Sequence, residues 1–319
     1  MIRRAATAAA LLALAACDGP ASMLAGAGRE AAAVEALFWP MLAGAAIIWA
    51  VVIGLALHAA RAPPHPERED TAELFVIWGG MVLPAILLTA LLVAGLLLLR
   101  DLGTSRADLT VTVEGEQWWW RVAYETPQGP ISSANEIRLP LGRTAEFALR
   151  SDDVIHSFWA PALGGKMDMI PGRTTTLRLT PTKPGRWAGN CAEFCGIAHA
   201  QMRFAVVVLP PAEFDAWAAA EAGPARTASE AGRAVFASAG CGACHAVRGT
   251  EAAGLAGPDL THLAARATIA AGILPLTRDN LRAWIHNPAG QKPGALMPGF
   301  PDLPPERMEA LLDYLAGLT

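Results

Sequence analysis

Charged residues are scarce in this chain of 319 residues. Asp, Glu, Lys and Arg make up 17% of it, against about 25% in ordinary soluble proteins. Apolar residues reach 53%, which exceeds the soluble range and indicates membrane segments. A basic excess is also lacking, because the formal net charge is −4. That balance disfavours a nucleic-acid binder, which would need a basic face.

Cysteine is sparse as well, with five residues in the chain. Four of them form two close pairs, Cys191 with Cys195 and Cys241 with Cys244. Disulfide frameworks use more cysteines at wider spacings, so the pairs indicate cofactor attachment. The fifth, Cys17, needs a separate explanation, which the N-terminus supplies.

The N-terminus has the pattern of an export signal, with two arginines followed by a short apolar run. The run ends in Leu14-Ala-Ala-Cys17, which resembles a bacterial lipobox. This resemblance implies a lipoprotein-type signal peptide over residues 1–16 and an acylated Cys17. An ordinary signal peptide that happens to contain a cysteine is the alternative. In both cases the chain after the leader begins outside the cytoplasm.

Two uncharged apolar stretches follow the leader, Leu37 to Leu57 and Ile77 to Leu99. Each reaches the roughly 20 residues that a helix needs to cross the hydrocarbon core of a membrane. The connector from Arg61 to Glu73 is rich in proline and charge and too short to be a domain. We therefore expect residues 17–104 to form a two-helix transmembrane hairpin.

Alternation of apolar and polar residues replaces the long runs between residues 105 and 212. Segments such as Leu109-Thr-Val-Thr-Val113 and Glu146-Phe-Ala-Leu-Arg150 are typical of strands. Prolines and glycines separate them at the spacing of a β-sandwich or barrel. We expect an all-β domain over 105–212, a linker over 213–227 and a helical domain over 228–319.

The densest group of metal-binding side chains lies in Cys191-Ala-Glu-Phe-Cys195-Gly-Ile-Ala-His199-Ala-Gln-Met202. A second imidazole, His156, comes from an earlier strand-like segment. Thiolate and thioether are soft ligands that suit copper, as imidazole does. A structural zinc site would have no use for Met202, and a single-copper blue site uses one cysteine. Two cysteines therefore favour a dinuclear copper centre.

With this motif the chain resembles subunit II of cytochrome c oxidase. The resemblance covers the paired membrane helices, an all-β domain that is cupredoxin-like in that family, and its ligand pattern Cys-x-Glu-x-Cys-x₃-His-x₂-Met with an upstream Asp-Val-x-His-Ser. It implies that Cys191 and Cys195 bridge the coppers and that Met202 is a weak ligand. His156 and His199 would each bind one copper.

Three further positions gain a meaning from the same resemblance. Glu193 would give its backbone carbonyl to copper, and its carboxylate would face a magnesium or manganese ion shared with subunit I. Trp118 matches the residue where electrons enter from cytochrome c, with a core or membrane-interface tryptophan as the alternative. Phe75 stands where many members carry a carboxylate at the entrance of a proton channel. A proton-entry role for this subunit therefore lacks its usual support.

The segment Cys241-Gly-Ala-Cys244-His245 is the attachment motif of a c-type heme. Its thiols add to the heme vinyl groups, and His245 becomes the proximal iron ligand. A bare cysteine pair could otherwise be a redox dithiol or half of a zinc site, but the histidine and the exported location favour heme.

A methionine is expected on the distal side of the heme iron. Met297 lies in a loop rich in glycine and proline, so we expect it to be that ligand. Met308 lies in an amphipathic helix, where methionine is most often part of the core. Residues 228–319 resemble class I cytochrome c, including Gly257-Pro-Asp-Leu260, whose proline carbonyl accepts a hydrogen bond from the proximal histidine in that family.

These features predict a multidomain membrane protein with a transmembrane hairpin, an all-β cupredoxin-like domain and an all-α class I cytochrome c domain. The implied function is that of subunit II of a respiratory cytochrome c oxidase. Electrons would pass from cytochrome c or another respiratory donor through heme c to dinuclear copper A, and on to subunit I, where oxygen is reduced to water and protons are translocated. Subunit I, other oxidase subunits and the bacterial inner membrane are the expected partners, with the copper and heme domains on the periplasmic side.

Two other functions stay open on the sequence. An electron-accepting subunit of a nitric-oxide-type reductase would share the redox chemistry, although the paired membrane helices favour the oxidase. A copper-delivery or assembly protein would need exchangeable copper, and neither a heme nor a complete ligand set would serve it.

Overall fold

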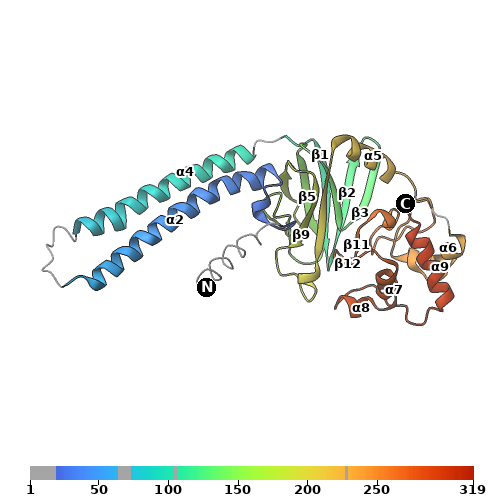
Figure 1. Cartoon of the computed structure of the whole chain (residues 1–319). Helices are drawn as coiled ribbons and strands as arrows, with labels where there is room; N and C mark the ends of the chain where they lie inside the picture. The colour runs from blue at the N-terminus through green and yellow to red at the C-terminus, as the bar shows by residue number, and fades with distance from the viewer. Residues whose placement is uncertain (1–18, 64–72, 104–105, 227–228) are drawn as a thin grey trace, which may run out of the picture. The chain divides into compact units, whose positions relative to one another are not determined.

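The structure is a computed structural model that describes residues 19–63, 73–103, 106–226 and 229–319 (Figure 1). The predicted leader and Cys17 lie outside the described residues, as does most of the connector between the apolar helices. The chain divides into two compact units. One is Ala33–Arg106, and the other combines residues up to Ala32 with Ala107–Thr319.

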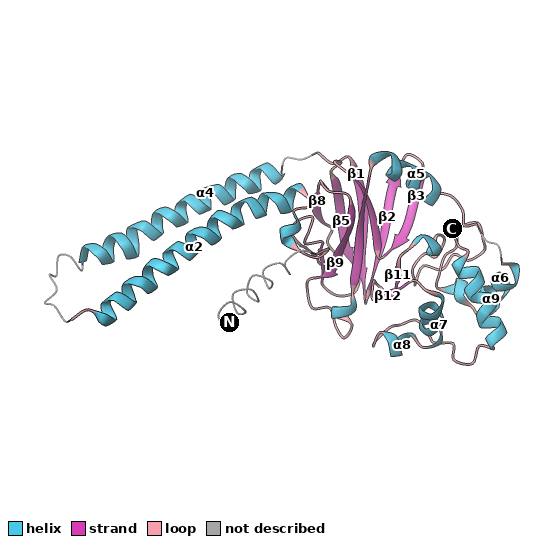
Figure 2. Ribbon diagram, viewed as in Figure 1, coloured by secondary structure: helices cyan, strands magenta, loops and turns pink. Residues whose placement is uncertain are grey.

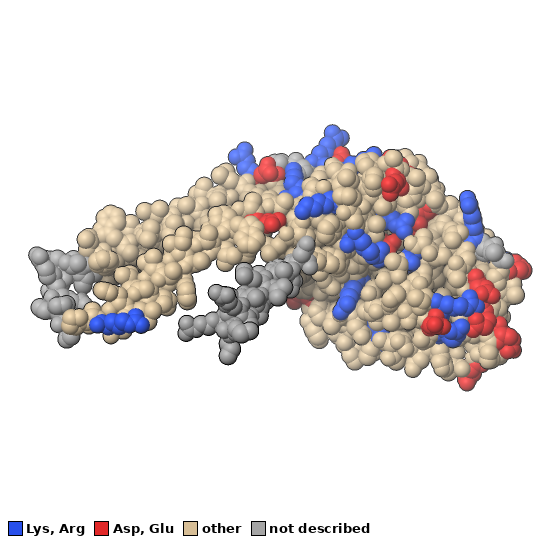
Figure 3. Space-filling model, viewed as in Figure 1, with Lys and Arg blue, Asp and Glu red and all other residues tan. Residues whose placement is uncertain are grey.

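The first unit contains two long apolar helices. Helix α2 spans Arg29–Arg61, and a second continuous helix covers Glu73–Leu102. Its first part includes the π-helical segment η3, Val76–Val82, followed by α4, Leu83–Gly103. Both helices are long and apolar enough to cross a membrane, and Figure 3 shows a long stretch of them without charged side chains. Pro84 at the start of α4 cannot donate a helical hydrogen bond, which accounts for the irregular turn just before it.

The second unit begins with a β-sandwich (Figure 2). Its strands are β1 (Leu109–Glu116), β2 (Trp119–Thr126), β3 (Gly129–Ala134), β4 (Glu136–Pro140), β5 (Ala145–Ser151), β6 (His156–Trp159), β7 (Met167–Met169), β8 (Thr175–Leu179), β9 (Gly185–Cys191) and β10 (Arg203–Leu209). One sheet has the order β3-β2-β1-β5-β8, and the other β4-β10-β9-β6-β7. The pairs β1–β5 and β4–β10 are parallel, and the other pairs are antiparallel.

Alternation places the apolar side chains of each strand inside the sandwich. Val111 and Val113 of β1 are fully buried while the residues between and beside them are partly exposed. The largest buried side chains are aromatic: Trp120, Tyr124, Phe147 and Phe158. Their rings pack edge-on or tilted, as Trp120 does against Phe158 with centroids 6.0 Å apart.

A segment ahead of α2 also belongs to the sandwich. Within residues 19–32 of this unit, the Ala27 amide donates to the Ala162 carbonyl at 2.8 Å. Glu30 at the start of α2 is only 7% exposed, and its carboxylate accepts from the backbone amide of Thr180 at 2.8 Å. Gly28 is required here because a Cβ would lie 2.1 Å from the Leu163 carbonyl oxygen. These contacts fix the end of the segment against the sandwich before the apolar run begins.

A helix and a smaller helical domain complete the chain. Helix α5, Pro211–Glu221, packs against β3 and β4 of the sandwich. The helical domain contains α6 (Glu230–Ser238), η5 (Cys241–Ala243), η6 (Leu263–Ala265), β11 (Thr268–Ile269), β12 (Leu274–Pro275), α7 (Arg278–His286), α8 (Pro288–Gln291) and α9 (Pro305–Ala316).

Two sequence features explain how these helices start and pack. Ser229 and Thr277 cap α6 and α7, each accepting a hydrogen bond from a first-turn amide. Gly232 lets α6 approach α9 closely, because a Cβ there would lie 2.0 Å from the Ala310 carbonyl oxygen. The core of this domain holds Met308 together with Leu311 and Leu312.

Candidate functional site

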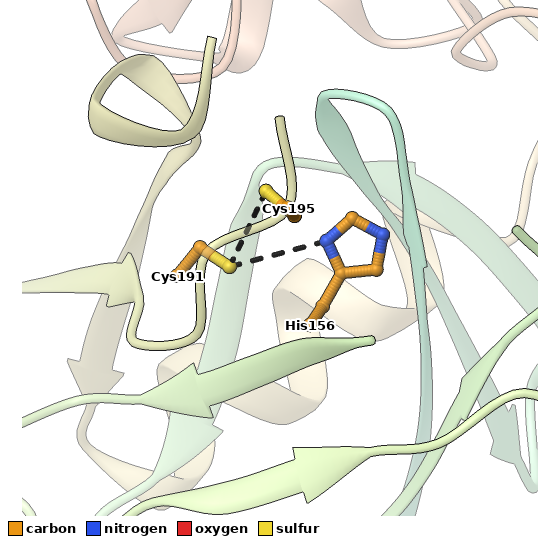
Figure 4. Close-up of side chains that lie close together, drawn as sticks. All are labelled: His156, Cys191 and Cys195. Carbon is orange, nitrogen blue, oxygen red and sulfur yellow. Dashed lines mark hydrogen bonds between the residues drawn. The ribbon is translucent and has the colours of Figure 1, made fainter. Parts of the chain in front are cut away.

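The soft ligands of the cysteine motif converge at one end of the sandwich. The metal-binding atoms of His156, Cys191 and Cys195 lie within 4.8 Å of one another. Figure 4 shows the three side chains pointing at each other, with Cys191 Sγ 3.9 Å from His156 Nδ1 and 3.7 Å from Cys195 Sγ. His156 is completely buried, and both cysteines are buried as well.

The remaining donors predicted from the motif join the same cluster. Cys195 Sγ lies 3.6 Å from His199 Nδ1 and 3.8 Å from Met202 Sδ. The Glu193 carbonyl oxygen lies 3.2 Å from Cys191 Sγ. The structure thus brings together all six donor groups that the sequence predicted, two of them sulfurs that could be shared between two metals.

Strand pairing builds this arrangement. Phe158 of β6 pairs with Cys191 of β9, which places His156 beside the first cysteine. The Cys191 amide donates to the Met202 carbonyl at 3.0 Å, so the loop closes on itself before β10. Gly196 has a φ of +120°, a conformation that glycine adopts at little cost.

The electrostatics of the two cysteines fit a bound cation. Hydrogen bonds from the Cys195 thiol and from His156 hold the pKa of Cys191 far below its ordinary value. The hydrogen bond with Cys191 in turn raises the pKa of Cys195, and burial raises it further. Two thiolates 3.7 Å apart in a buried site therefore need positive charge between them, which a metal ion supplies.

A carboxylate orients the histidine of β6. Asp153 Oδ1 lies 2.8 Å from His156 Nε2, which leaves Nδ1 facing the sulfurs. Asp153 also accepts from the backbone amides of Val154 and Gln117 at 2.6 and 2.7 Å. Such a partner fixes the tautomer and ring position of a metal-binding histidine.

The Glu193 side chain lies outside this cluster. Its carboxylate is 3.7 Å from Lys166 Nζ, which also binds Asp168 at 2.9 Å. Among the described residues, Glu193 belongs to no group of three or more metal-binding side chains. The geometry therefore gives no support to the magnesium or manganese ion, which stays a prediction.

A cavity of about 960 Å³ lies against the helical domain. Its lining includes Cys241, Cys244, His245 and Met297, the four residues that the sequence predicted to hold a heme. The volume falls in the range of cofactor pockets in proteins. Met308 lies instead in the hydrophobic core among α6, α7 and α9.

The proximal histidine is held as the resemblance implied. His245 Nδ1 lies 2.7 Å from the Pro258 carbonyl oxygen, so it donates there and leaves Nε2 free for a metal. Gly257 allows this approach, because a Cβ would lie 2.6 Å from His245 Cε1. Burial lowers the pKa of His245, which favours the neutral imidazole that binds iron.

Two residues of the cavity were not predicted from the sequence. Arg266 lines it, and its Nε is buried without a partner among the described residues. A guanidinium there suits the carboxylates that a heme carries. Lys292 also lines the cavity and is 4% exposed. No sequence signal marks either side chain as buried, although Lys292 precedes Met297 by only five residues.

Trp118 lies between the two sites. Its Nε1 donates to the Cys195 carbonyl at 3.0 Å, and Gln117 Nε2 donates to the same oxygen at 2.8 Å. The same tryptophan lines the cavity that contains His245. Trp118 is partly buried, in contrast to the fully buried Trp120 two residues later.

Comparison with known proteins identifies both halves of the second unit. Residues 128–209 match the family "Cytochrome C oxidase subunit II, periplasmic domain", and residues 229–319 match "Cytochrome c". These matches and the observed elements confirm the predicted fold class. The first implies a copper A site and the second a heme.

Named relatives extend the match into the rest of the chain. The chain is 40% identical to cytochrome c oxidase subunit 2 of Alkalihalophilus pseudofirmus over 268 residues, covering 80% of this chain and 75% of the relative. It is 33% identical to the Bacillus subtilis protein of that name over 277 residues, covering 79% and 76%.

A solved structure is also similar to part of the chain. The periplasmic domain of subunit II of cytochrome oxidase (CoxB) of Bradyrhizobium japonicum is 32% identical, with 37% of this chain and 95% of that chain covered and a TM-score of 0.35. The assignment rests on the sequence matches, which span most of both chains. This chain belongs to the cytochrome c oxidase subunit 2 family, with a cytochrome c domain at its C-terminus.

Proposed function

We propose that this chain is the subunit through which electrons enter a respiratory cytochrome c oxidase. Cytochrome c or another donor would reduce heme c in the C-terminal domain, and electrons would pass to dinuclear copper A and then to subunit I. Reduction of oxygen to water, coupled to proton translocation, would occur in that partner. The observation that carries the proposal is Trp118, which contacts the Cys195 carbonyl and also lines the cavity of His245.

The copper-binding roles follow from the donor cluster. Cys191 and Cys195 would bridge the metals because their sulfurs are 3.7 Å apart at its centre. His156 lies beside the sulfur of Cys191 and His199 beside that of Cys195, and each histidine would bind one copper. Met202 and the Glu193 carbonyl would complete the set as weak ligands.

The heme-binding roles follow from the cavity. Cys241 and Cys244 would form the thioether links, His245 would bind iron from the proximal side, and Met297 from the distal side. Both cofactors, when bound, would supply one-electron redox chemistry. The contribution of the protein is to bury them, to hold their ligands still and to place Trp118 between them.

The location follows from the helices and the matched domain. Two helices long enough to span a membrane and a domain of periplasmic type make a membrane protein with an outward-facing domain. We propose the bacterial inner membrane, with both redox domains on the periplasmic side. The other oxidase subunits would then meet this chain in the membrane.

The copper assignment has a direct spectroscopic test. Cys191→Ser and Cys195→Ser should each abolish the seven-line paramagnetic resonance signal and the near-infrared absorption of a mixed-valence copper pair. The heme spectrum serves as the internal control, because its ligands lie in a separate domain. Retention of the seven-line signal in either variant would contradict the assignment.

The reaction itself is tested on the purified complex supplied with reduced cytochrome c. Oxygen uptake that requires this chain supports the oxidase. Consumption of nitric oxide without oxygen uptake would instead identify a reductase.

A further inference from the structure

A short segment of the C-terminal domain reaches across to the copper-binding domain. Lys292, Pro293 and Gly294 follow helix α8 and precede Met297 by a few residues. The Lys292 Nζ donates to the Trp118 backbone carbonyl at 2.5 Å. Its side chain is buried, and burial lowers the pKa of Lys292 to about 8. At pH 7 the amine is therefore still mostly protonated and makes a charge-assisted hydrogen bond.

Gly294 of the same segment packs directly on the indole of Trp118. A Cβ at this position would lie 2.5 Å from Cζ3 and 2.8 Å from Cη2 of that ring. The φ of Gly294 is +85°, so the backbone also favours glycine. Two independent features thus select glycine where the two domains touch.

The other edge of the indole meets a second glycine. A Cβ on Gly196, in the loop of the copper-site ligands, would lie 3.0 Å from Trp118 Cζ2. The indole is therefore held between Gly196 of one domain and Gly294 of the other, while its Nε1 binds the Cys195 carbonyl. No bulkier residue at either glycine would leave this spacing intact.

Arginine side chains make the same kind of contact elsewhere on the seam between the domains. Arg121 donates to the Leu255 carbonyl at 2.6 Å and Arg138 to the Ala265 carbonyl at 3.0 Å. From the other side, Arg248 donates to the Glu221 carbonyl at 2.8 Å. Within the described part of the chain, both partners of each salt bridge lie either before Glu221 or after it. Charged side chains thus donate hydrogen bonds to backbone carbonyl oxygens across the seam.

Resting on the proposed function, we propose that Lys292 and Gly294 form a clamp that seats the cytochrome domain on Trp118 of its own chain. Trp118 is then covered by an intramolecular partner, so a free cytochrome would deliver electrons to the C-terminal domain and not to Trp118. Lys292 and Gly294 act as positioning residues for the contact between the two redox domains.

Amine labelling of the intact oxidase tests the clamp without measuring activity. The chain has three lysines, Lys166, Lys183 and Lys292, so an acylating reagent followed by peptide mass spectrometry resolves each one. Lys183 is exposed and should react readily, whereas Lys292 should be protected. Equal labelling of Lys292 and Lys183 in the wild-type oxidase would overturn the proposal.

A pair of glycine variants separates the clamp from backbone strain. Gly294→Ala should expose Lys292 and raise its labelling about 10-fold or more, as expected for the loss of one hydrogen bond to a charged group. Gly142 has a φ of +76°, and a Cβ there would meet nothing within 4 Å. Gly142→Ala therefore strains the backbone in the same way as Gly294→Ala, but without meeting Trp118, and should leave Lys292 protected. Continued protection in Gly294→Ala would refute the clamp.

Kinetics then test the positioning role. In Lys292→Met, with heme and copper spectra unchanged, electron transfer from heme to copper after flash reduction should slow about 10-fold. Lys292→Arg keeps a charged donor and should restore part of the rate. Unchanged transfer in Lys292→Met would overturn the positioning role, while the absence of any heme-to-copper transfer in the wild type would instead refute the proposed function.

Discussion

Replacing Trp118 by phenylalanine separates its role in electron transfer from a role in folding. The change removes the hydrogen bond from Nε1 to the Cys195 carbonyl and keeps an aromatic ring between Gly196 and Gly294. A neutral hydrogen bond contributes about 1 kcal/mol. In a domain of this size that loss lowers the melting temperature by roughly 4–8 °C. The copper site should therefore stay folded and loaded.

Trp120 provides the contrast two residues away. It is fully buried, and its ring packs on Phe158 and Phe204, with centroids 6.0 and 5.1 Å away. Trp120→Ala should cost about 3–5 kcal/mol. Because His156 lies against the same ring, copper should be lost together with the fold.

Flash reduction of the heme followed by time-resolved copper absorbance distinguishes the two residues. Trp118→Phe should slow heme-to-copper transfer while both cofactor spectra persist. An unchanged rate with intact cofactors would remove Trp118 from the electron path, and lost copper would make it a structural residue.

Four other substitutions test the heme site and the N-terminal segment. Met297→His should keep the heme attached but lower its potential, because a nitrogen ligand favours ferric iron; Met308→Leu, a core change of similar volume, should leave the potential unaltered in the same redox titration. Gly257→Ala places a Cβ 2.6 Å from His245 and should abolish the low-spin heme spectrum. Glu30→Gln should lower the unfolding free energy of the sandwich by about 1–3 kcal/mol in denaturant titration, since it weakens a buried hydrogen-bonded carboxylate.

Local sequence patterns predicted the parts of this protein that depend on local chemistry. The donors of the copper motif lie within twelve residues of Cys191 apart from His156, so one loop gathers them. Uncharged runs predicted the spanning helices, but not that α2 begins at Arg29. Glu30 is helical and buried because the Thr180 amide donates a hydrogen bond to its carboxylate. A search for uncharged runs cannot detect a partner so far along the chain.

Contacts between the domains could not be predicted in this way. Lys292 and Trp118 are 174 residues apart in the chain, and a lone lysine in a polar loop is ordinarily exposed. Its burial depends on a backbone carbonyl, which every residue carries and no sequence pattern marks. Trp118 was predicted as a site residue, whereas its contact with Gly294 emerges only from the fold.

The proposed function is tested most directly by whether the heme reduces the copper within one chain. After flash reduction of the heme in purified oxidase, heme oxidation and copper reduction should proceed together with a first-order rate that dilution leaves unchanged. Moderate salt should also have little effect, because the charged side chains at the seam bind backbone carbonyls and, among the described residues, no salt bridge crosses it. Copper reduction that precedes heme reduction, or a rate that falls on dilution, would contradict electron transfer from heme to copper within one chain.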